Sequence, residues 1–181
     1  WRRWDPVAYV DLHTTDGAKF EHDVAVLVGP KAPRPEDAAD ALAPAARALS
    51  DALQARLTAL GHLPLPFYPA FATDDDPASG FDDVDPPARF SHAYAPARGR
   101  LGVLVETHSW RTYGERVRAT YHVLQTLLER AVTDAAGWRA AADAADRADA
   151  ALAGRDVVLA WRTTSEARTV EFRGYRYERV P

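Results

Sequence analysis

Residues 7–17 read VAYVDLHTTDG, and this stretch decides the fold that we expect. An apolar run leads into Asp11, Leu12 and His13, and a polar turn then ends at Gly17. A histidine at the end of a short buried strand, just before a glycine turn, is typical of α/β proteins, whose strand ends carry ligand-binding side chains. The stretch therefore predicts a buried strand over residues 7–12 with a candidate metal ligand, His13, at its carboxyl end.

Two more apolar runs indicate buried strands. They cover residues 24–28 (VAVLV) and residues 101–105 (LGVLV), and the second run leads directly into Glu106. Leucines at helical spacing predict a helix over residues 36–60, between these two runs. Strands that alternate with helices favour a layered α/β fold. We therefore expect a three-layer α/β/α arrangement around a mixed, mainly parallel sheet, of which the chain holds a part.

Local signals mark where the helices should begin and end. Pro44 should kink or restart the first helix, and Gly61 should end it. After the third strand, Thr112 and Glu115 have the spacing of a capping box. Residues 133–134 (Thr-Asp) look like the N-cap of a further, alanine-rich helix. The helix before this second cap should turn one apolar stripe toward the core, formed by Val117, Tyr121, Leu124, Leu128 and Val132.

The remaining segments have weaker patterns. Residues 63–100 lack a clear periodicity and are rich in proline and aspartate, so we expect a long functional or disordered loop there. Residues 156–161 and 169–172 predict two strands. These strands would form a short β extension at the C-terminus.

Composition excludes several classes of protein and of site. The 181 residues carry a net charge of -4 without a basic tract, so nothing favours binding to nucleic acid. No apolar run approaches the ~20 residues of a membrane span. The chain contains no cysteine, which excludes disulfides, thiolate metal sites and cysteine nucleophiles. Because the first residue is Trp1 rather than methionine, we expect a truncated or processed start, and the compartment is left open.

His13 and Glu106 are the residues best placed to carry chemistry. Each follows an apolar strand run, and both side chains would reach one crevice if the two strands are parallel neighbours. A neutral imidazole can bind zinc. A carboxylate beside the metal can take a proton from a bound water and pass it to a leaving group. Taken alone, however, such a histidine is more often a structural residue, and such a glutamate is usually solvated or paired with an arginine.

The sequence around these two residues resembles that of the zinc metallocarboxypeptidases, the carboxypeptidase A-like enzymes. The resemblance is carried by VDLHTTDG at residues 10–17 and LVETHSWRTYGERVRATY at residues 104–121, and it is strongest to the bacterial predicted-carboxypeptidase branch. It implies that His13 is the third zinc ligand and that Glu106 is the general base. It also implies that the substrate is a peptide or a small amide.

Two further segments extend this resemblance. ARFSHAYAPARGR, at residues 88–100, is similar to the stretch that precedes the catalytic glutamate in the family, which implies that Ser91, Tyr94 and Arg98 line the substrate pocket. TVEFRGYRYE, at residues 169–178, resembles the start of an accessory β region found in some relatives.

The chain also departs from the family pattern. The family takes its first two zinc ligands from a His-x-x-Glu motif upstream of the DLH histidine, and an arginine and an Asn-Arg pair that binds the substrate carboxylate come from the same region. None of these is present. The resemblance therefore implies that residues 1–153 are the C-terminal half of a catalytic domain and that residues 154–181 begin a β extension. We expect zinc in the intact protein, a partner in the upstream half of the same domain, and no activity from this chain alone.

Other functions stay open at this point. His13 and Glu106 would equally serve a zinc-dependent deacylase of N-acyl amino acids. A different class is a non-catalytic binding or structural module with a degenerate site. His108 could add a ligand, although a structural hydrogen bond is the commoner role. The aspartates between residues 74 and 85 form a solvated acidic loop more readily than a calcium site.

Overall fold

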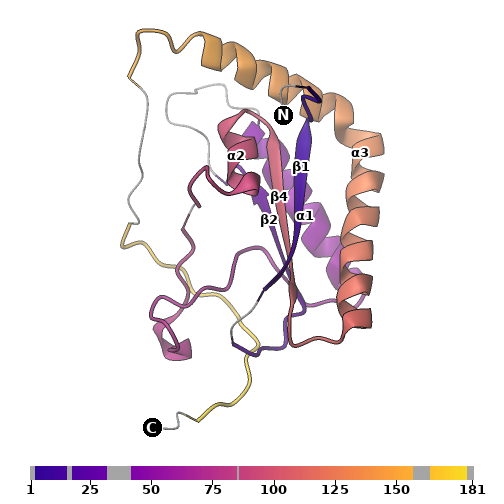
Figure 1. Cartoon of the computed structure of the whole chain (residues 1–181), viewed down its shortest axis with the longest axis vertical. Coiled ribbons are helices and arrows are strands. Elements are labelled where there is room, and N and C mark those ends of the chain that lie inside the picture. Colours follow the sequence, from indigo (N-terminus) through magenta and orange to yellow (C-terminus); the bar gives the residue numbers. More distant parts are fainter. Residues whose placement is uncertain (1–2, 16–17, 32–41, 85, 157–163, 179–181) are drawn as a thin grey trace.

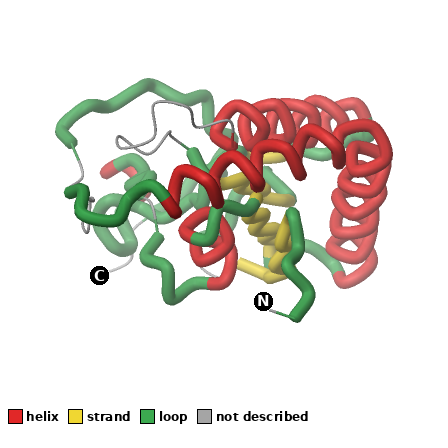
Figure 2. Tube along the Cα trace, turned by 90° about the horizontal axis from the view of Figure 1, so that it is seen from above, coloured by secondary structure: helices red, strands yellow, loops and turns green. Residues whose placement is uncertain are grey.

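A mixed sheet of four strands forms the centre of the protein. The structure is a computed structural model, and it describes residues 3–15, 18–31, 42–84, 86–156 and 164–178. The strands lie in the order β1 (Ala8–Thr15), β4 (Leu101–His108), β2 (Val24–Gly29) and β3 (Pro64–Leu65). β1 runs parallel to β4 and β3 runs parallel to β2, whereas β4 and β2 are antiparallel. The expected α/β fold and its three longer strands are confirmed, and Figure 2 shows these strands in the middle of the molecule with helical segments around them.

Helices α1 (Leu42–Ala59) and α3 (Tyr113–Ala150) cover one face of the sheet. Valines of β2 and β4 pack there against the leucine stripe of α1, in which Leu53 and Leu57 are fully buried. The described part of α1 begins at Leu42, which places Pro44 in its first turn, where a proline removes no intrahelical hydrogen bond. The predicted part of this helix before residue 42 lies outside the described residues. Gly61 ends the helix as predicted, with a φ of 85°.

Helix α3 begins as predicted but does not stop where expected. Thr112 and Glu115 form both halves of the capping box. The predicted N-cap at residues 133–134 is wrong, because the helix continues to Ala150. The Thr133 hydroxyl donates a hydrogen bond back to the Arg130 carbonyl, 3.1 Å away, and therefore caps no new helix. Figure 1 shows α3 running beside β1 and then curving over one end of the sheet.

The apolar stripe predicted for α3 is also wrong, because the helix buries a different side. Of the predicted stripe, only Leu124 packs partly against the core, and the other members are exposed. The buried residues of α3 are Ala119, Val123, Thr126, Leu127, Trp138, Ala141, Ala142 and Ala145. α3 has two apolar sides, and the periodicity of the sequence did not show which of them is buried. The small alanine side chains of the buried side allow the helix to approach the sheet and α1 closely.

An ion-pair network holds the curved half of α3 at the starts of β1 and β4. The buried Arg100 places its Nη1 atom 2.8 Å from Asp146 on α3 and its Nη2 atom 2.7 Å from Asp5 before β1. Both carboxylates help to raise the pKa of Arg100 by accepting its hydrogen bonds, and Asp146 has the larger effect. The guanidinium therefore joins three segments of the chain at one point.

The opposite face of the sheet carries the short helix α2 (Ser91–Ala97) and the irregular segment around it, which contains the 3-10 helix η1 (Pro77–Ser79). Phe20, Phe67 and Leu104 belong to a second, smaller core there. α2 lies so close to β4 that a Cβ atom at Gly102 would stand 2.0 Å from the carbonyl oxygen of His92. Glycine at this position is therefore required by the approach of the two backbones.

The C-terminal segment crosses this second core without forming the predicted strands. Residues 157–163, on which most of the first predicted strand falls, lie outside the described residues. Residues 169–172 are not a strand, and the segment makes an isolated bridge between Gly174 and Phe20 instead. Phe172 packs its ring 5.3 Å from the ring of Phe20 and 4.6 Å from that of Phe81. The Arg173 carbonyl also accepts a hydrogen bond from the Glu21 amide at 2.9 Å, and the Arg173 amide donates one to His22 Nε2 at 3.2 Å. Aromatic packing and these bonds hold the segment in place of a β ladder.

None of the helices in the described segments combines the length and the apolar character that crossing a bilayer requires.

The contact between α2 and β4 predicts that Gly102→Ala lowers the free energy of unfolding by about 3 kcal/mol, the upper end of the range for overpacking. Gly137→Ala is the matched control, since a Cβ atom at this position inside α3 meets nothing. It should raise stability by up to about 1 kcal/mol, because alanine favours helix. Urea unfolding of both variants measures the difference, and an equal response to the two substitutions would contradict the described packing of α2.

Candidate functional site

His13 and Glu106 lie opposite each other on parallel strands. In the register of β1 and β4, their Cα atoms are direct partners. Directly paired residues of a sheet point their side chains to the same face. The parallel pairing on which the predicted site depended is therefore present, and it places the imidazole and the carboxylate beside each other near the carboxyl ends of both strands.

The two side chains differ in their access to solvent. The side chain of His13 is 54% exposed, because β1 is the outermost strand of the sheet. Glu106 is 7% exposed, because β4 lies inside the sheet between β1 and β2. The pair thus combines an imidazole that a ligand can reach with a carboxylate that is largely shielded from bulk water.

Asp11 and Ser91 hold the imidazole of His13 in place. The Nε2 atom of His13 lies 2.9 Å from Asp11 Oδ1, and the second carboxylate oxygen of Asp11 accepts a hydrogen bond from the Ser91 hydroxyl. A carboxylate bound to one imidazole nitrogen orients the ring and leaves the other nitrogen available. We did not anticipate this role of Asp11 from the sequence, although residues two apart on a strand share a face.

The three residues expected in a substrate pocket lie on or beside α2. Ser91 begins the helix, and its hydroxyl binds Asp11 next to His13. Tyr94 is exposed on the helix, and Arg98 is its exposed C-cap, whose carbonyl oxygen accepts a hydrogen bond from Arg100. The structure therefore brings Ser91 to the His13–Asp11 pair and leaves Tyr94 and Arg98 on the surface of α2.

His108 forms hydrogen bonds with the backbone through both of its ring nitrogens. Its Nε2 atom lies 3.1 Å from the Ala18 carbonyl oxygen, and its Nδ1 atom accepts a hydrogen bond from the Trp110 amide at 3.2 Å. Burial lowers the pKa of His108, so the ring stays neutral and donates from Nε2. With both nitrogens bound, this histidine fills the structural role rather than that of a metal ligand.

A groove of about 450 Å³ opens on the α3 side of His13. β1 and β4 contribute its floor, and α3 contributes its wall. The lining residues are Leu12, His13, Thr14, Thr107, Tyr113, Arg116, Val117, Thr120, Tyr121 and Leu124. His13 lines the groove, but its ring contacts Asp11 beside α2, so the imidazole and Glu106 lie on the other face of the sheet. The wall of the groove carries part of the exposed apolar side of α3.

The described residues do not by themselves fit a catalytic zinc ion. Such a site takes three protein ligands. Within the described ranges, no group of three or more histidine, aspartate or glutamate side chains is placed to hold a metal. The same result covers the described aspartates of the acidic loop, where Asp76 caps η1 and Asp83 lies 2.5 Å from Lys31. Around His13 the chain offers one imidazole and neighbouring carboxylates.

Comparisons with protein-family models, with curated proteins and with solved structures find no match to this chain.

Four histidines with lowered pKa values predict that the protein loses stability in mild acid. The pKa values of His22, His92, His108 and His122 are all lowered from 6.5, in each case mainly by burial. The unfolded chain therefore binds more protons below this value, so stability is complete above about pH 6.5 and falls as the pH decreases toward the lowered pKa values. Denaturant unfolding at pH 7 and pH 5 measures this loss, and equal or greater stability at pH 5 would contradict it.

Proposed function

We propose that this chain carries part of the active site of a zinc-dependent hydrolase of the carboxypeptidase type, which cleaves an amide bond near a free carboxylate. The observation that supports this most strongly is the direct register of His13 with Glu106 on the parallel strands β1 and β4. This arrangement is what the resemblance of residues 10–17 and 104–121 to metallocarboxypeptidases requires of the two residues. The proposed substrate is a peptide or a small amide.

The roles of the chain's own residues follow from their positions. Glu106 acts as the general base, because a shielded carboxylate can accept a proton from an attacking water and return it to the leaving amine. His13 is the residue that would hold zinc, and Asp11 positions its ring through the 2.9 Å contact to Nε2. Ser91, Tyr94 and Arg98, on or beside the neighbouring α2, are the proposed substrate-binding residues.

The missing ligands would come from the upstream half of the same catalytic domain. The outer edge of β1 pairs with no other strand in the described part of the chain. Beside this edge, Leu12 on β1 and Tyr113, Val117 and Tyr121 on α3 leave an apolar surface exposed. An open strand edge next to exposed apolar side chains favours coverage by another segment. A segment that pairs with the open edge of β1 would pass beside His13, where further ligands are needed.

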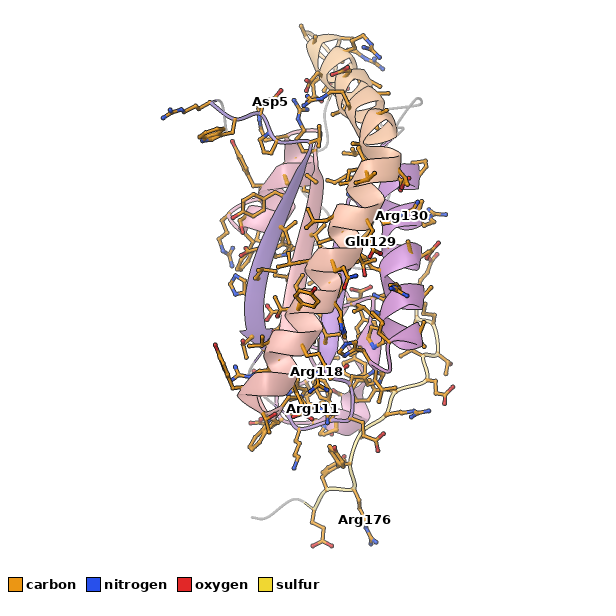
Figure 3. The ribbon with its side chains drawn as sticks, turned by 90° about the vertical axis from the view of Figure 1, so that its right-hand side faces the viewer. Asp5, Arg111, Arg118, Glu129, Arg130 and Arg176 are labelled. Carbon is orange, nitrogen blue, oxygen red and sulfur yellow. The ribbon has the colours of Figure 1, made fainter. Side chains whose placement is uncertain are left out.

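Glu106→Gln tests the proposed base in the longer protein that includes the upstream half. The amide keeps the shape of the side chain but cannot accept the proton, so kcat should fall about 10²–10⁴-fold, the usual contribution of general acid–base catalysis. Bound zinc should remain. Glu129→Gln is the matched control, since Glu129 is an exposed residue in the middle of α3 (Figure 3). Hydrolysis at the unmodified rate by Glu106→Gln would contradict this role.

Metal content tests the proposed division of the site. The 181-residue chain alone should bind no zinc at nanomolar affinity, whereas the longer protein should bind one ion and lose it on His13→Ala. Competition against a chelator of known affinity measures both. Stoichiometric, nanomolar zinc in the 181-residue chain would contradict the proposal that the chain holds only part of the site.

A further inference from the structure

Three titratable side chains form a continuous chain away from the proposed site. Asp23, just before β2, places Oδ2 2.6 Å from Nδ1 of His62, which follows α1. Nε2 of His62 lies 2.7 Å from Nδ1 of His122 on α3, with the rings in an edge-to-face arrangement. The proposed hydrolytic site uses none of these groups. These hydrogen-bonded side chains link the segment before β2, the end of α1 and the first half of α3.

The hydrogen bonds of Asp23 determine which ring nitrogen of His62 carries a hydrogen. Asp23 accepts a second hydrogen bond from the Leu63 amide through Oδ1, at 2.9 Å, so both of its oxygens serve as acceptors. His62 therefore donates from Nδ1 to a carboxylate. His62 is 7% exposed, so its Nε2 atom has His122 as its partner rather than bulk water.

The contact between the two imidazoles allows only some protonation states. With both rings neutral, His122 donates from Nδ1 to the lone pair on Nε2 of His62. With one added proton, a single hydrogen still lies between the two nitrogens, and the bond becomes charge-assisted. With two added protons, both nitrogens carry a hydrogen, and two N–H groups cannot face each other at 2.7 Å. The second proton must therefore separate the rings.

Charged groups of both signs surround the pair. The carboxylate of Asp23 lies against His62, and Glu21 and Glu115 line the cleft of about 290 Å³ beside it. Arg111 and Arg118 line the same cleft, and Figure 3 shows both near the beginning of α3. The pKa of His122 is lowered by burial first, and then by His62, Arg118 and Arg56 on α1.

We propose that Asp23, His62 and His122 form an acid-released clasp, which holds α3 against the end of α1 and the start of β2 with up to one added proton and opens when the second proton binds. The clasp is closed at neutral pH and opens as the pH falls. Because α3 forms the wall of the groove beside β1, opening loosens that wall. The clasp stands on its own geometry and does not depend on zinc or on hydrolysis.

Hydrogen exchange of the intact 181-residue chain tests the clasp, with rates corrected for the intrinsic effect of pH. Between pH 7 and pH 5, amides near His122 and at residues 60–63 should lose protection, by about tenfold for each unit by which pairing lowers the second pKa. His122→Asn should abolish the part of this loss that exceeds the loss elsewhere in the protein, because an amide can either donate to or accept from His62 but cannot bind a proton. His92→Asn is the matched control, since the pKa of His92 is also lowered by burial, and it should keep the loss.

A titration of the unmodified protein gives a second test that requires no variant. Nitrogen chemical shifts of the imidazoles should show His62 and His122 taking up protons in two separate steps. The second step should coincide with the loss of protection around His122. The proposal is overturned if protection does not change between pH 7 and pH 5, if it changes equally in His122→Asn, or if the two rings titrate independently of each other.

Discussion

The backbone groups of β4 must find all their hydrogen-bond partners inside the protein, because all eight residues of the strand are buried. β2 satisfies one edge in antiparallel register and β1 satisfies the other in parallel register. The side chains of β4 alternate between the two cores, with Val103 and Val105 facing α1 and α3 and Leu104 facing the aromatic cluster. Shifting the register by one residue would exchange these faces. The same constraint therefore fixes both the cores and the position of Glu106 opposite His13.

Glu106 is the one acidic residue on β4, and it is buried near the end of the strand. The end of a strand next to an open sheet edge is where a buried carboxylate can act on a ligand. The proposed catalytic role uses this position of Glu106. His108, two residues on, is buried as well and binds the backbone at Ala18 and Trp110.

Features with local causes could be predicted from the sequence, and features set by distant contacts could not. Apolar runs gave the three longer strands, and Thr112 with Glu115 gave the start of α3, because each signal lies within a few residues. The buried side of α3 depends on its fit to α1 and the sheet, so periodicity chose the wrong stripe. In the candidate site, the positions of His13 and Glu106 near the ends of their strands could be predicted from the sequence. The contact of Asp11 with Ser91, eighty residues away in sequence, required the fold.

Hydrogen-bond scalar couplings between β1 and β4 test the central claim, the register that places His13 opposite Glu106. The pairing is bracketed by two backbone bonds, from the Leu101 amide to the Val7 carbonyl and from the Ser109 amide to the Thr15 carbonyl, each 3.1 Å long. We predict that triple-resonance spectra of the deuterated chain show couplings for both bonds. Couplings from these amides to carbonyls one residue along, or their absence, would contradict the account, because His13 and Glu106 would then no longer share a face.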